Sequence, residues 1–506
     1  MTCFQLRSAG VAFALLASTS GLVAVSDPVP SSVDTATSAT TLTRSVTQTG
    51  VFGGTELTYL ASIEQLDVQA DVEGKGASLV TISYVSEETA DPAERPVLFI
   101  FNGGPISASY PLHIGATGPY RVSFDDDLSV PAEEADLVPN PYSPLDVADL
   151  VFYDPALTGL STLHDGVSPE TYASVTGDAE EFVEFVHAWL TKHDRLDSPV
   201  FILGESYGTM RAAEGAGQLN ETYPDIDVDG VFLMGQAVNI IEYAQRQQNI
   251  LSFVVSLPTL AAGAWDLGLV EQDGYTFESF LDEATAFADT EYLTALYKGH
   301  TISAEEQVAI AEKLEAYTGL SKEVYVENNL RVSKEAYRRL VLKADGLITG
   351  RSDIRYTANA EEAGAYGDPS GVIGKAYADG FAEYFEMTFG TPLPESYTSV
   401  SGYAGTGSWD WKFSSPFDSF AYGDAMNALF EANPDFRVVI GSGWHDTQTT
   451  AGSARYLASQ SPWPADRVHL AFYRGGHMAY SVEESAEAFG QDIRDMITGQ
   501  SGTAED

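Results

Sequence analysis

Six short segments of this chain are apolar at nearly every position and are bounded by turn-forming residues. A strand with one face in water alternates apolar and polar residues, whereas a strand that is buried on both faces is apolar throughout. We therefore predict a mostly parallel central sheet. The six predicted strands are VLFIF (97–101), ADLVFY (148–153), VFIL (200–203), GVFLM (230–234), RVVIG (437–441) and VHLAFY (468–473).

The segments between these strands predict an α/β domain that is interrupted once. DAEEFVEFVHAWLTKH (178–193) places Phe182, Val186 and Trp189 on one helical face, and it separates the second strand from the third as in a βαβ unit. From about residue 240 to 398 helical patterns dominate, which predicts a lid inserted between strands of the sheet. The predicted divisions are a signal peptide (1–26), a Ser/Thr-rich lead-in (27–55), the first part of the α/β domain (56–240), the helical lid insertion (241–398), the second part of the α/β domain (399–499) and a flexible tail (500–506).

The first residues have the layout of a secretory signal. A single basic residue, Arg7, precedes an apolar stretch that ends in small residues at 23–26. A membrane anchor is the alternative, but residues 18–21 make the stretch too polar for a typical span. We therefore expect an exported protein, periplasmic or extracellular, without stable membrane association after signal removal. Because the one cysteine, Cys3, lies in this segment, no disulfide is expected.

The composition is strongly acidic. The chain carries 26 Lys and Arg against 73 Asp and Glu, which gives a formal net charge of −47 at pH 7. A surface of this charge repels nucleic acid and anionic membranes, so neither is an expected partner. No cluster of histidine and acidic residues has the spacing of metal ligands, and we predict neither a metal nor an organic cofactor.

One glycine-rich turn has the pattern of a nucleophile elbow. LGESYGT (203–209) contains G-x-S-x-G, with the strand VFIL before it and a helix-like segment, TMRAAEGAGQL, after it. In this context the turn forces Ser206 to project above the sheet, and the backbone N–H of Tyr207 lies at the start of a helix. An incidental serine in a βα turn is the alternative. The pattern predicts an α/β-hydrolase fold with Ser206 as the nucleophile.

A serine nucleophile needs a histidine base that is held by an acid, and α/β-hydrolases place the acid and then the histidine after the serine. Asp446 follows the strand RVVIG and His477 follows the strand VHLAFY, which fits this order. His445 is a poorer base because no acid follows it in the right place, and His469 is expected to pack within a strand. A turn-forming aspartate is the alternative role for Asp446.

A second glycine-rich turn, FNGGPIS (101–107), follows the strand VLFIF. Its glycines allow backbone amides to approach a substrate without an intervening side chain. We predict an oxyanion hole formed by the backbone N–H groups of Gly104 and Tyr207, each of which would stabilise the transition state by about 3 kcal/mol. A plain turn is the alternative for NGGP.

Taken together, these motifs resemble those of the serine carboxypeptidase family, most closely its bacterial branch without disulfides. The resemblance covers residues from about 90 to 495 and implies an α/β-hydrolase that removes C-terminal residues from peptides, generally best at acidic pH. It rests on NGGP (102–105), GP (118–119), NPYSPLDVADLVFYDPALTGLS (140–161), GESYGT (204–209), GWHD (443–446) and GGHM (475–478).

The resemblance also implies a role for Glu205, the acid directly before the serine. In the family this glutamate binds the free carboxylate of the substrate, is held protonated by a second glutamate, and is assisted by the asparagine of NGGP, here Asn102. Two close carboxyls raise one pKa because both cannot ionise cheaply. The position of the second glutamate is Ala116 in this chain. Burial must then keep Glu205 neutral, unless His113 offers a positive charge to the substrate.

Two further positions depart from the family pattern. Ile106 stands where the family has glycine after NGGP, and we expect it to reshape the mouth of the site. Leu157 replaces the first glycine of the family segment D-P-x-G-T-G-F-S.

The expected function is that of a secreted serine carboxypeptidase with peptide substrates and an acyl-enzyme intermediate. Ser206 attacks the last peptide bond, His477 shuttles the proton and Asp446 orients the imidazole. A serine acyltransferase or esterase on the same scaffold is the alternative, and the loss of a glutamate at Ala116 favours it.

Overall fold

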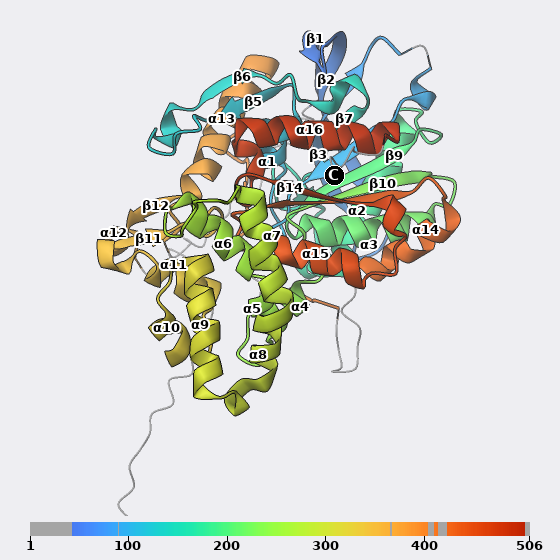
Figure 1. The fold of residues 1–506 in the computed structure, drawn as a ribbon. Helices are drawn as coiled ribbons and strands as arrows, with labels where there is room; N and C mark the ends of the chain where they lie inside the picture. Colours follow the sequence, from blue (N-terminus) through green and yellow to red (C-terminus); the bar gives the residue numbers. More distant parts are fainter. Residues whose placement is uncertain (1–42, 90, 365–366, 403–408, 413–421, 501–506) are drawn as a thin grey trace, which may run out of the picture. The chain divides into compact units, whose positions relative to one another are not determined.

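The computed structural model describes residues 43–89, 91–364, 367–402, 409–412 and 422–500 (Figure 1). The predicted signal peptide, most of the predicted lead-in and nearly all of the predicted tail lie outside these residues. The lead-in was predicted to extend to residue 55, and this is wrong for its last part, because Arg44–Phe52 forms strand β1. Its β-branched Thr and Val residues suit a strand, and β2 (Thr55–Val68) supplies the antiparallel hydrogen-bonding partner.

A central sheet contains all six predicted strands. Within the described residues it has ten strands in the order β1-β2-β3-β7-β4-β9-β10-β13-β14, with β8 paired to β3. The neighbouring strands β7, β4, β9, β10, β13 and β14 are parallel to one another, which confirms a mostly parallel sheet. Strands β1, β2 and β3 join them by antiparallel pairing. The remaining bounds are β3 (Ala77–Ser86), β4 (Val97–Phe101), β7 (Asp149–Phe152), β8 (Thr162–Leu163), β9 (Val200–Glu205), β10 (Val228–Met234), β13 (Arg437–Gly443) and β14 (Val468–Tyr473).

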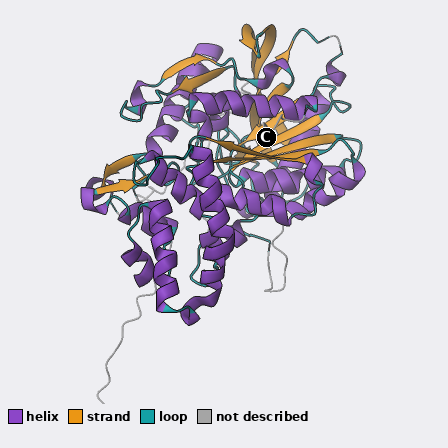
Figure 2. Cartoon of the chain, in the orientation of Figure 1, coloured by secondary structure: helices purple, strands orange, loops and turns teal. Residues whose placement is uncertain are grey.

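Helices cover both faces of this sheet, which explains why the strands are apolar throughout (Figure 2). Phe99 and Ile202 point to one face and pack with helices α2, α3, α14 and α15, whereas Leu98 and Leu203 point to the other and pack with α13 and α16. The bounds are α2 (Val175–Lys192), α3 (Gly208–Thr222), α14 (Asn427–Ala432), α15 (Ala451–Gln460), α13 (Gly371–Phe389) and α16 (Glu483–Thr498).

Most of the remaining helices lie between β10 and β13. They enclose a hydrophobic cluster of their own, which includes Phe253, Phe287 and Leu314. Helix α13 instead contacts β1 and β5, so the end of this insertion packs on the main sheet domain. The bounds of the helices in this insertion are α4 (Ile240–Tyr243), α5 (Leu251–Val254), α6 (Leu257–Asp266), α7 (Phe277–Phe287), α8 (Leu293–Lys298), α9 (Ala304–Thr318), α10 (Lys322–Glu327), α11 (Lys334–Leu340) and α12 (Ala360–Ala363). The insertion also contains a hairpin of β11 (Leu347–Thr349) and β12 (Thr357–Asn359). Earlier in the chain, between β4 and β7, lie the short helix α1 (Tyr110–Leu112) and the antiparallel strands β5 (Tyr120–Ser123) and β6 (Asp136–Pro139).

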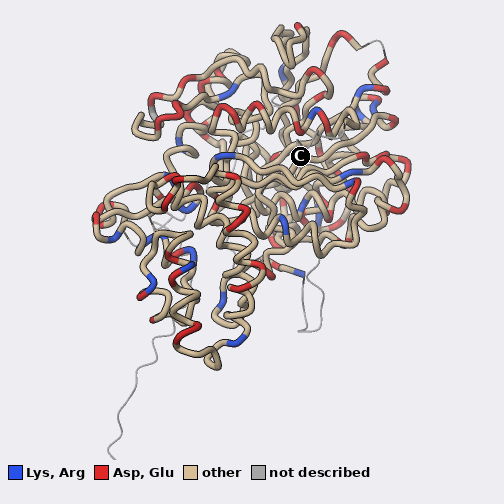
Figure 3. Tube along the Cα trace, in the orientation of Figure 1, with Lys and Arg blue, Asp and Glu red and all other residues tan. Residues whose placement is uncertain are grey.

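Acidic residues are distributed over every part of the described chain, and Lys and Arg are scattered among them (Figure 3). Among the described residues, no helix combines the length and the hydrophobicity needed to cross a membrane. The same residues contain no group of three His, Cys, Asp or Glu side chains arranged to hold a metal ion.

Candidate active site

The predicted nucleophile lies on a strained turn between a strand and a helix. β9 ends at Glu205 and α3 begins at Gly208, and Ser206 between them has a φ of 61°. This left-handed conformation costs a residue with a side chain about 1–2 kcal/mol. The Ser206 N–H donates to the carbonyl of Met234 at 2.9 Å, at the end of the neighbouring strand β10. The turn therefore holds Ser206 at the carboxyl edge of the sheet, as a nucleophile elbow requires.

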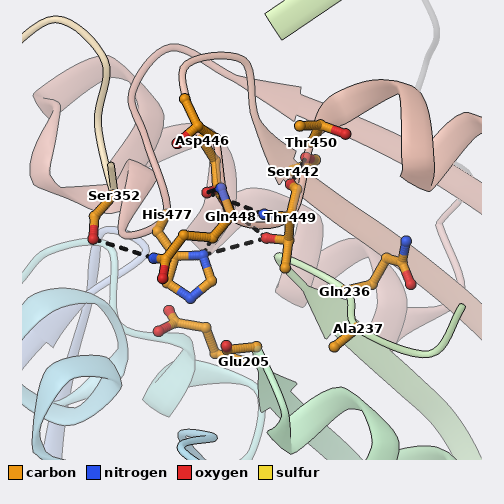
Figure 4. Close-up of polar contacts among 12 residues, drawn as sticks. Glu205, Gln236, Ala237, Ser352, Ser442, Asp446, Gln448, Thr449, Thr450 and His477 are labelled. Atoms are coloured by element: carbon orange, nitrogen blue, oxygen red, sulfur yellow. Dashed lines mark hydrogen bonds and ion pairs between the residues drawn. The ribbon is translucent and has the colours of Figure 1, made fainter. Parts of the chain in front are cut away.

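The predicted acid and base meet at the ends of two adjacent parallel strands, β13 and β14 (Figure 4). Nδ1 of His477 lies 2.7 Å from Oδ2 of Asp446. Oδ1 of Asp446 accepts hydrogen bonds from the backbone N–H groups of Gln448 at 2.7 Å and Thr449 at 3.2 Å, and Oδ2 also accepts one from the Thr449 hydroxyl. The buried carboxylate is thus fully hydrogen-bonded, and it fixes Nδ1 as the protonated nitrogen and Nε2 as the base.

The imidazole of His477 can lie close to the elbow because Gly235, which it contacts there, has no side chain. A Cβ built on Gly235 would lie 3.3 Å from both Nδ1 and Cε1 of His477. Gly235 directly follows Met234, whose carbonyl accepts the N–H of Ser206. Among the described side chains no hydrogen bond joins the Ser206 hydroxyl to His477. Such contacts are often long in substrate-free enzymes and tighten when substrate binds.

Electrostatic interactions at this pair stabilise the imidazolium. Burial disfavours a charge on His477, but the charge and hydrogen bond of Asp446, with a further contribution from Glu205, outweigh it and raise the pKa of His477 to about 9. The cation that forms when neutral His477 accepts the proton of an attacking serine is therefore stabilised in this site.

We expect Asp446→Asn to lower kcat for an ester substrate by about ten-thousand-fold near pH 7, because an amide no longer selects the imidazole tautomer with a free Nε2. The control is Asp435→Asn, which changes an exposed aspartate that lies two residues before the start of β13. Steady-state kinetics and thermal unfolding measure the two variants side by side. Retention of activity within tenfold in a folded Asp446→Asn protein would show that another acid orients His477.

The loop after β4 lies directly on the elbow and carries a free backbone donor. A Cβ on Gly103 would lie 2.5 Å from the Tyr207 nitrogen and 2.8 Å from the Gly208 nitrogen, so only glycine fits there. Gly104 is exposed and has a φ of 114°. Within the described part of the chain, the N–H groups of Gly104 and Tyr207 donate to no acceptor. Both are therefore available to a developing oxyanion.

A buried guanidinium holds this loop in place. Arg211, on α3, donates to the carbonyls of Asn102 and Pro105, each at 3.0 Å. It also forms a bidentate ion pair with Asp178 on α2, with distances of 2.8 and 2.9 Å. Its side chain is completely buried. Sequence reasoning missed Arg211, because a single arginine in a helix rich in small residues gives no signal of what it contacts.

Glu205 is buried and accepts a hydrogen bond at each carboxylate oxygen. Oε1 accepts from Nδ2 of Asn102 at 2.8 Å, and Oε2 accepts from the hydroxyl of Tyr480 at 2.7 Å. The Leu112 N–H donates to Oδ1 of Asn102 at 3.1 Å, which fixes the orientation of the amide. Burial raises the pKa of Glu205 to about 6, against the opposing effects of the His477 charge and the two hydrogen bonds. In Figure 4 the Glu205 carboxylate lies next to the imidazole of His477.

The hypothesis that His113 supplies a positive charge is wrong. His113 is buried, stacks on the ring of Phe152 with centroids 3.9 Å apart, and places Nε2 2.7 Å from the hydroxyl of Tyr84. Burial lowers the pKa of His113 to about 3, so the ring is neutral at the pH of any ordinary assay.

The two other departures from the family pattern have simple structural outcomes. Ile106 is buried in the hydrophobic core with α2 and α3, so the expected change at the mouth of the site is not found. Leu157 has a φ of 72°, a conformation that glycine adopts without strain. The backbone of this loop is therefore kept although the glycine is absent.

His445 has a structural role. Its Nδ1 accepts a hydrogen bond from the Gly475 N–H at 3.1 Å, and its Nε2 lies 2.8 Å from Oδ2 of Asp266 at the end of α6. Burial lowers the pKa of His445. Because both nitrogens are engaged, this histidine is not available as a base, and it instead links the acid loop to the loop that carries His477.

A segment of the helical insertion also forms hydrogen bonds to the loops that carry Asp446 and His477, which sequence reasoning did not predict. The carbonyl of Ser352 accepts the N–H of His477 at 2.6 Å, and the Ser352 hydroxyl accepts a hydrogen bond from Nε2 of Gln448 at 3.2 Å. The Ile354 N–H donates to the carbonyl of His445 at 3.0 Å. The insertion is therefore part of the scaffold of the site.

Part of this chain is similar in sequence to proteins of a known family. Residues 81–248 match the serine carboxypeptidase family. Serine carboxypeptidase-like 13 from Arabidopsis thaliana is 27% identical over 168 residues, which are 33% of this chain and 37% of that protein. Serine carboxypeptidase-like 5 from the same plant is 30% identical over 130 residues, which are 25% of this chain and 28% of that protein. The chain thus matches only about a third of the length of these curated relatives.

Among solved structures, the crystal structure of a prohormone-processing carboxypeptidase from Saccharomyces cerevisiae aligns with a TM-score of 0.53. The alignment covers 87% of this chain and 91% of that chain at 12% sequence identity. At this identity the likeness bears on the fold alone, and it confirms the predicted α/β-hydrolase fold.

Proposed function

We propose that this chain, whose residues 81–248 match the serine carboxypeptidase family, is a serine-type carboxypeptidase that cleaves C-terminal residues from peptides. Ser206 attacks the carbonyl carbon of the last peptide bond, and His477 takes the serine proton and passes it to the leaving amine. Asp446 orients the imidazole. The N–H groups of Gly104 and Tyr207 bind the oxyanion, and water then hydrolyses the acyl-enzyme.

The observation that carries this proposal is the buried carboxyl of Glu205 beside Asn102, directly before the nucleophile. An ionised carboxylate there would repel the developing oxyanion and slow the reaction. A carboxyl group at this position is therefore expected only where it has a function of its own. In its protonated form Glu205 donates a hydrogen bond to the terminal carboxylate of a peptide. The raised pKa of Glu205 supports this role, because it allows the neutral form to exist at mildly acidic pH.

The proposal is tested with a blocked dipeptide, its C-terminal amide and an aryl ester, each with and without a serine-directed phosphonylating reagent. Release of the free terminal amino acid, abolished by labelling of Ser206, is the expected result. Cleavage of the ester alone would favour the acyltransferase or esterase alternative. Absence of labelling at Ser206 would contradict both functions.

The preference for a free carboxylate is expected to depend on pH. Both the dipeptide and its amide need a neutral His477, so the ratio of their kcat/KM values isolates the titration of Glu205. The ratio is highest when Glu205 is protonated and falls as pH rises through the pKa of Glu205, which is raised to about 6 with the His477 charge beside it. Measurement of both substrates across pH gives this curve.

Glu205→Gln provides the matched control for this titration, because glutamine is neutral at every pH and has nearly the same shape. We expect its ratio to be independent of pH and its dipeptide activity near neutral pH to equal or exceed that of the unaltered protein. Loss of dipeptide cleavage at every pH would show that Glu205 has a different task.

We also propose that the chain is exported, to the periplasm or to the medium. The support is the signal pattern of residues 1–26, with its basic residue, apolar stretch and small residues. Fractionation of expressing cells and N-terminal sequencing of the recovered protein test this, and an intact N-terminus in the cytoplasmic fraction would contradict it.

A further inference from the structure

The second partner of Glu205 is a tyrosine from a distant part of the chain. Tyr480 lies in a short 3-10 turn, Ala479–Ser481, just after His477, and its side chain is fully buried. Its ring packs against the turn that carries Gly115 and Ala116, since a Cβ on Gly115 would lie only 2.6 Å from Cε2 of Tyr480. The ring of Tyr480 thus lies against Gly115, and the absence of a side chain at this position leaves room for it.

Within the described part of the chain, four titratable side chains interact with Glu205 from the elements packed around it. His477 and Asp446 face it from the loops after β14 and β13, Tyr480 from the turn before α16, and Tyr377 from α13. Among the described residues no carboxyl group forms a hydrogen bond with Glu205. Its immediate partners are two neutral donors, the Asn102 amide and the Tyr480 hydroxyl, and both donate to the ionised form.

We propose that Tyr480 sets the protonation of Glu205 and thereby the preference of the site for substrates with a free C-terminal carboxylate. The inference rests on the proposed function. In the free protein the Tyr480 hydroxyl donates to ionised Glu205. When a substrate carboxylate binds, Glu205 takes up one proton from solvent and donates it in a hydrogen bond to the substrate. The phenol stays hydrogen-bonded in either state, because a hydroxyl both donates and accepts.

A phenol and a second carboxyl shift the pKa of Glu205 in opposite directions. A second carboxyl would repel the charge of Glu205 and raise its pKa, whereas a hydroxyl donor favours the charged form and lowers it. Burial and the Glu205 charge hold the pKa of Tyr480 well above its usual range, so the phenol itself does not ionise. Tyr480 therefore confines carboxylate recognition to a lower pH than burial alone would give.

The test compares Tyr480→Phe with Tyr377→Phe. Both remove one hydroxyl from buried tyrosines whose ring centroids lie 5.9 Å apart, but in the described structure the Tyr377 hydroxyl has no hydrogen-bond partner. The readout is the ratio of kcat/KM for the blocked dipeptide and its amide as a function of pH. For Tyr480→Phe we expect the midpoint of this ratio to rise by about one pH unit, because one hydrogen bond to the charged form is lost. For Tyr377→Phe we expect no shift.

Two further variants make the test independent of folding defects. In a Glu205→Gln background, Tyr480→Phe is expected to leave the flat ratio unchanged. Incorporation of 3-fluorotyrosine at position 480 gives a stronger donor of nearly the same size, and we expect it to lower the midpoint.

The outcomes separate this inference from the proposed function. Coincident midpoints for the unaltered protein, Tyr480→Phe and the fluorinated protein, all of which cleave the dipeptide, would overturn the role of Tyr480 alone. Failure of the unaltered protein to release a terminal amino acid would overturn the proposed function instead. An equal shift with Tyr377→Phe would show that a general change in packing, rather than the hydrogen bond, moves the titration.

Discussion

Ser206→Ala is expected to lower kcat for the aryl ester by about a million-fold, because it removes the nucleophile and with it the use of His477 and Asp446. The residual rate comes from the oxyanion donors and from substrate binding, which the substitution leaves in place. Steady-state kinetics with stoichiometric phosphonylation of the unaltered protein measure the effect. A loss of less than about a hundred-fold in a pure preparation would show that another residue is the nucleophile.

The elbow offers a matched variant that separates chemistry from stability. Alanine at position 206 keeps the strain of a φ of 61°, whereas glycine adopts this conformation freely. Ser206→Gly is therefore expected to be as inactive as Ser206→Ala and to exceed it in free energy of unfolding by about 1 kcal/mol. Denaturant unfolding of the two variants measures the difference. Equal stability would show that the turn relaxes when the serine is removed.

Arg211→Met is expected to lower the free energy of unfolding by about 3–5 kcal/mol, because it leaves the carboxylate of Asp178 buried without its partner. The same substitution frees the carbonyls of Asn102 and Pro105, which the guanidinium holds at 3.0 Å. The loop that carries Gly104 then loses its fixed position over the elbow. We expect kcat to fall by about ten-fold to a thousand-fold, within the range seen when an oxyanion donor is lost.

The double variant Arg211→Met with Asp178→Leu separates the two effects. Removal of both charges eliminates the uncompensated carboxylate, and buried ion pairs are often replaced by apolar residues at little cost in stability. We expect unfolding free energy to return towards the original value while kcat stays low, because neither new side chain donates to Asn102 or Pro105. Recovery of both quantities would show that Arg211 stabilises the fold without positioning the loop.

The parts of the fold that were predicted correctly are those whose structural requirements restrict the residue types of a short continuous segment. Because β4 is buried on both faces, each of its residues is apolar, and VLFIF can be predicted as a strand without knowledge of its neighbours in space. The elbow can also be predicted, because its constraint acts between residues that are close in sequence. A Cβ on Gly204 would lie 2.3 Å from the carbonyl oxygen of Gly208, only four residues away. Asp446 and His477 were proposed as acid and base because each lies in the loop after such a strand, and the structure places their side chains in contact.

Predictions failed or were missing where the outcome depended on a distant segment. The segment Arg44–Phe52 has few large apolar residues and was predicted to be flexible, but pairing with β2 makes it a strand. His113 was given a possible charge, and burial against Phe152 removes that charge.

The sequence by itself thus determined the strands of the parallel sheet and the turn at Ser206, because each depends on a few consecutive residues. It also indicated Ser206, Asp446 and His477 as the proposed nucleophile, acid and base, because each lies in a loop after a predicted strand. Only the tertiary structure decided how the acid before the serine is held. Tyr480 lies 275 residues from Glu205, and Arg211 contacts loop residues more than a hundred positions before it. Hydrogen bonds and burial act between neighbours in space, and no pattern within a single segment specifies which distant side chain a buried carboxylate will meet.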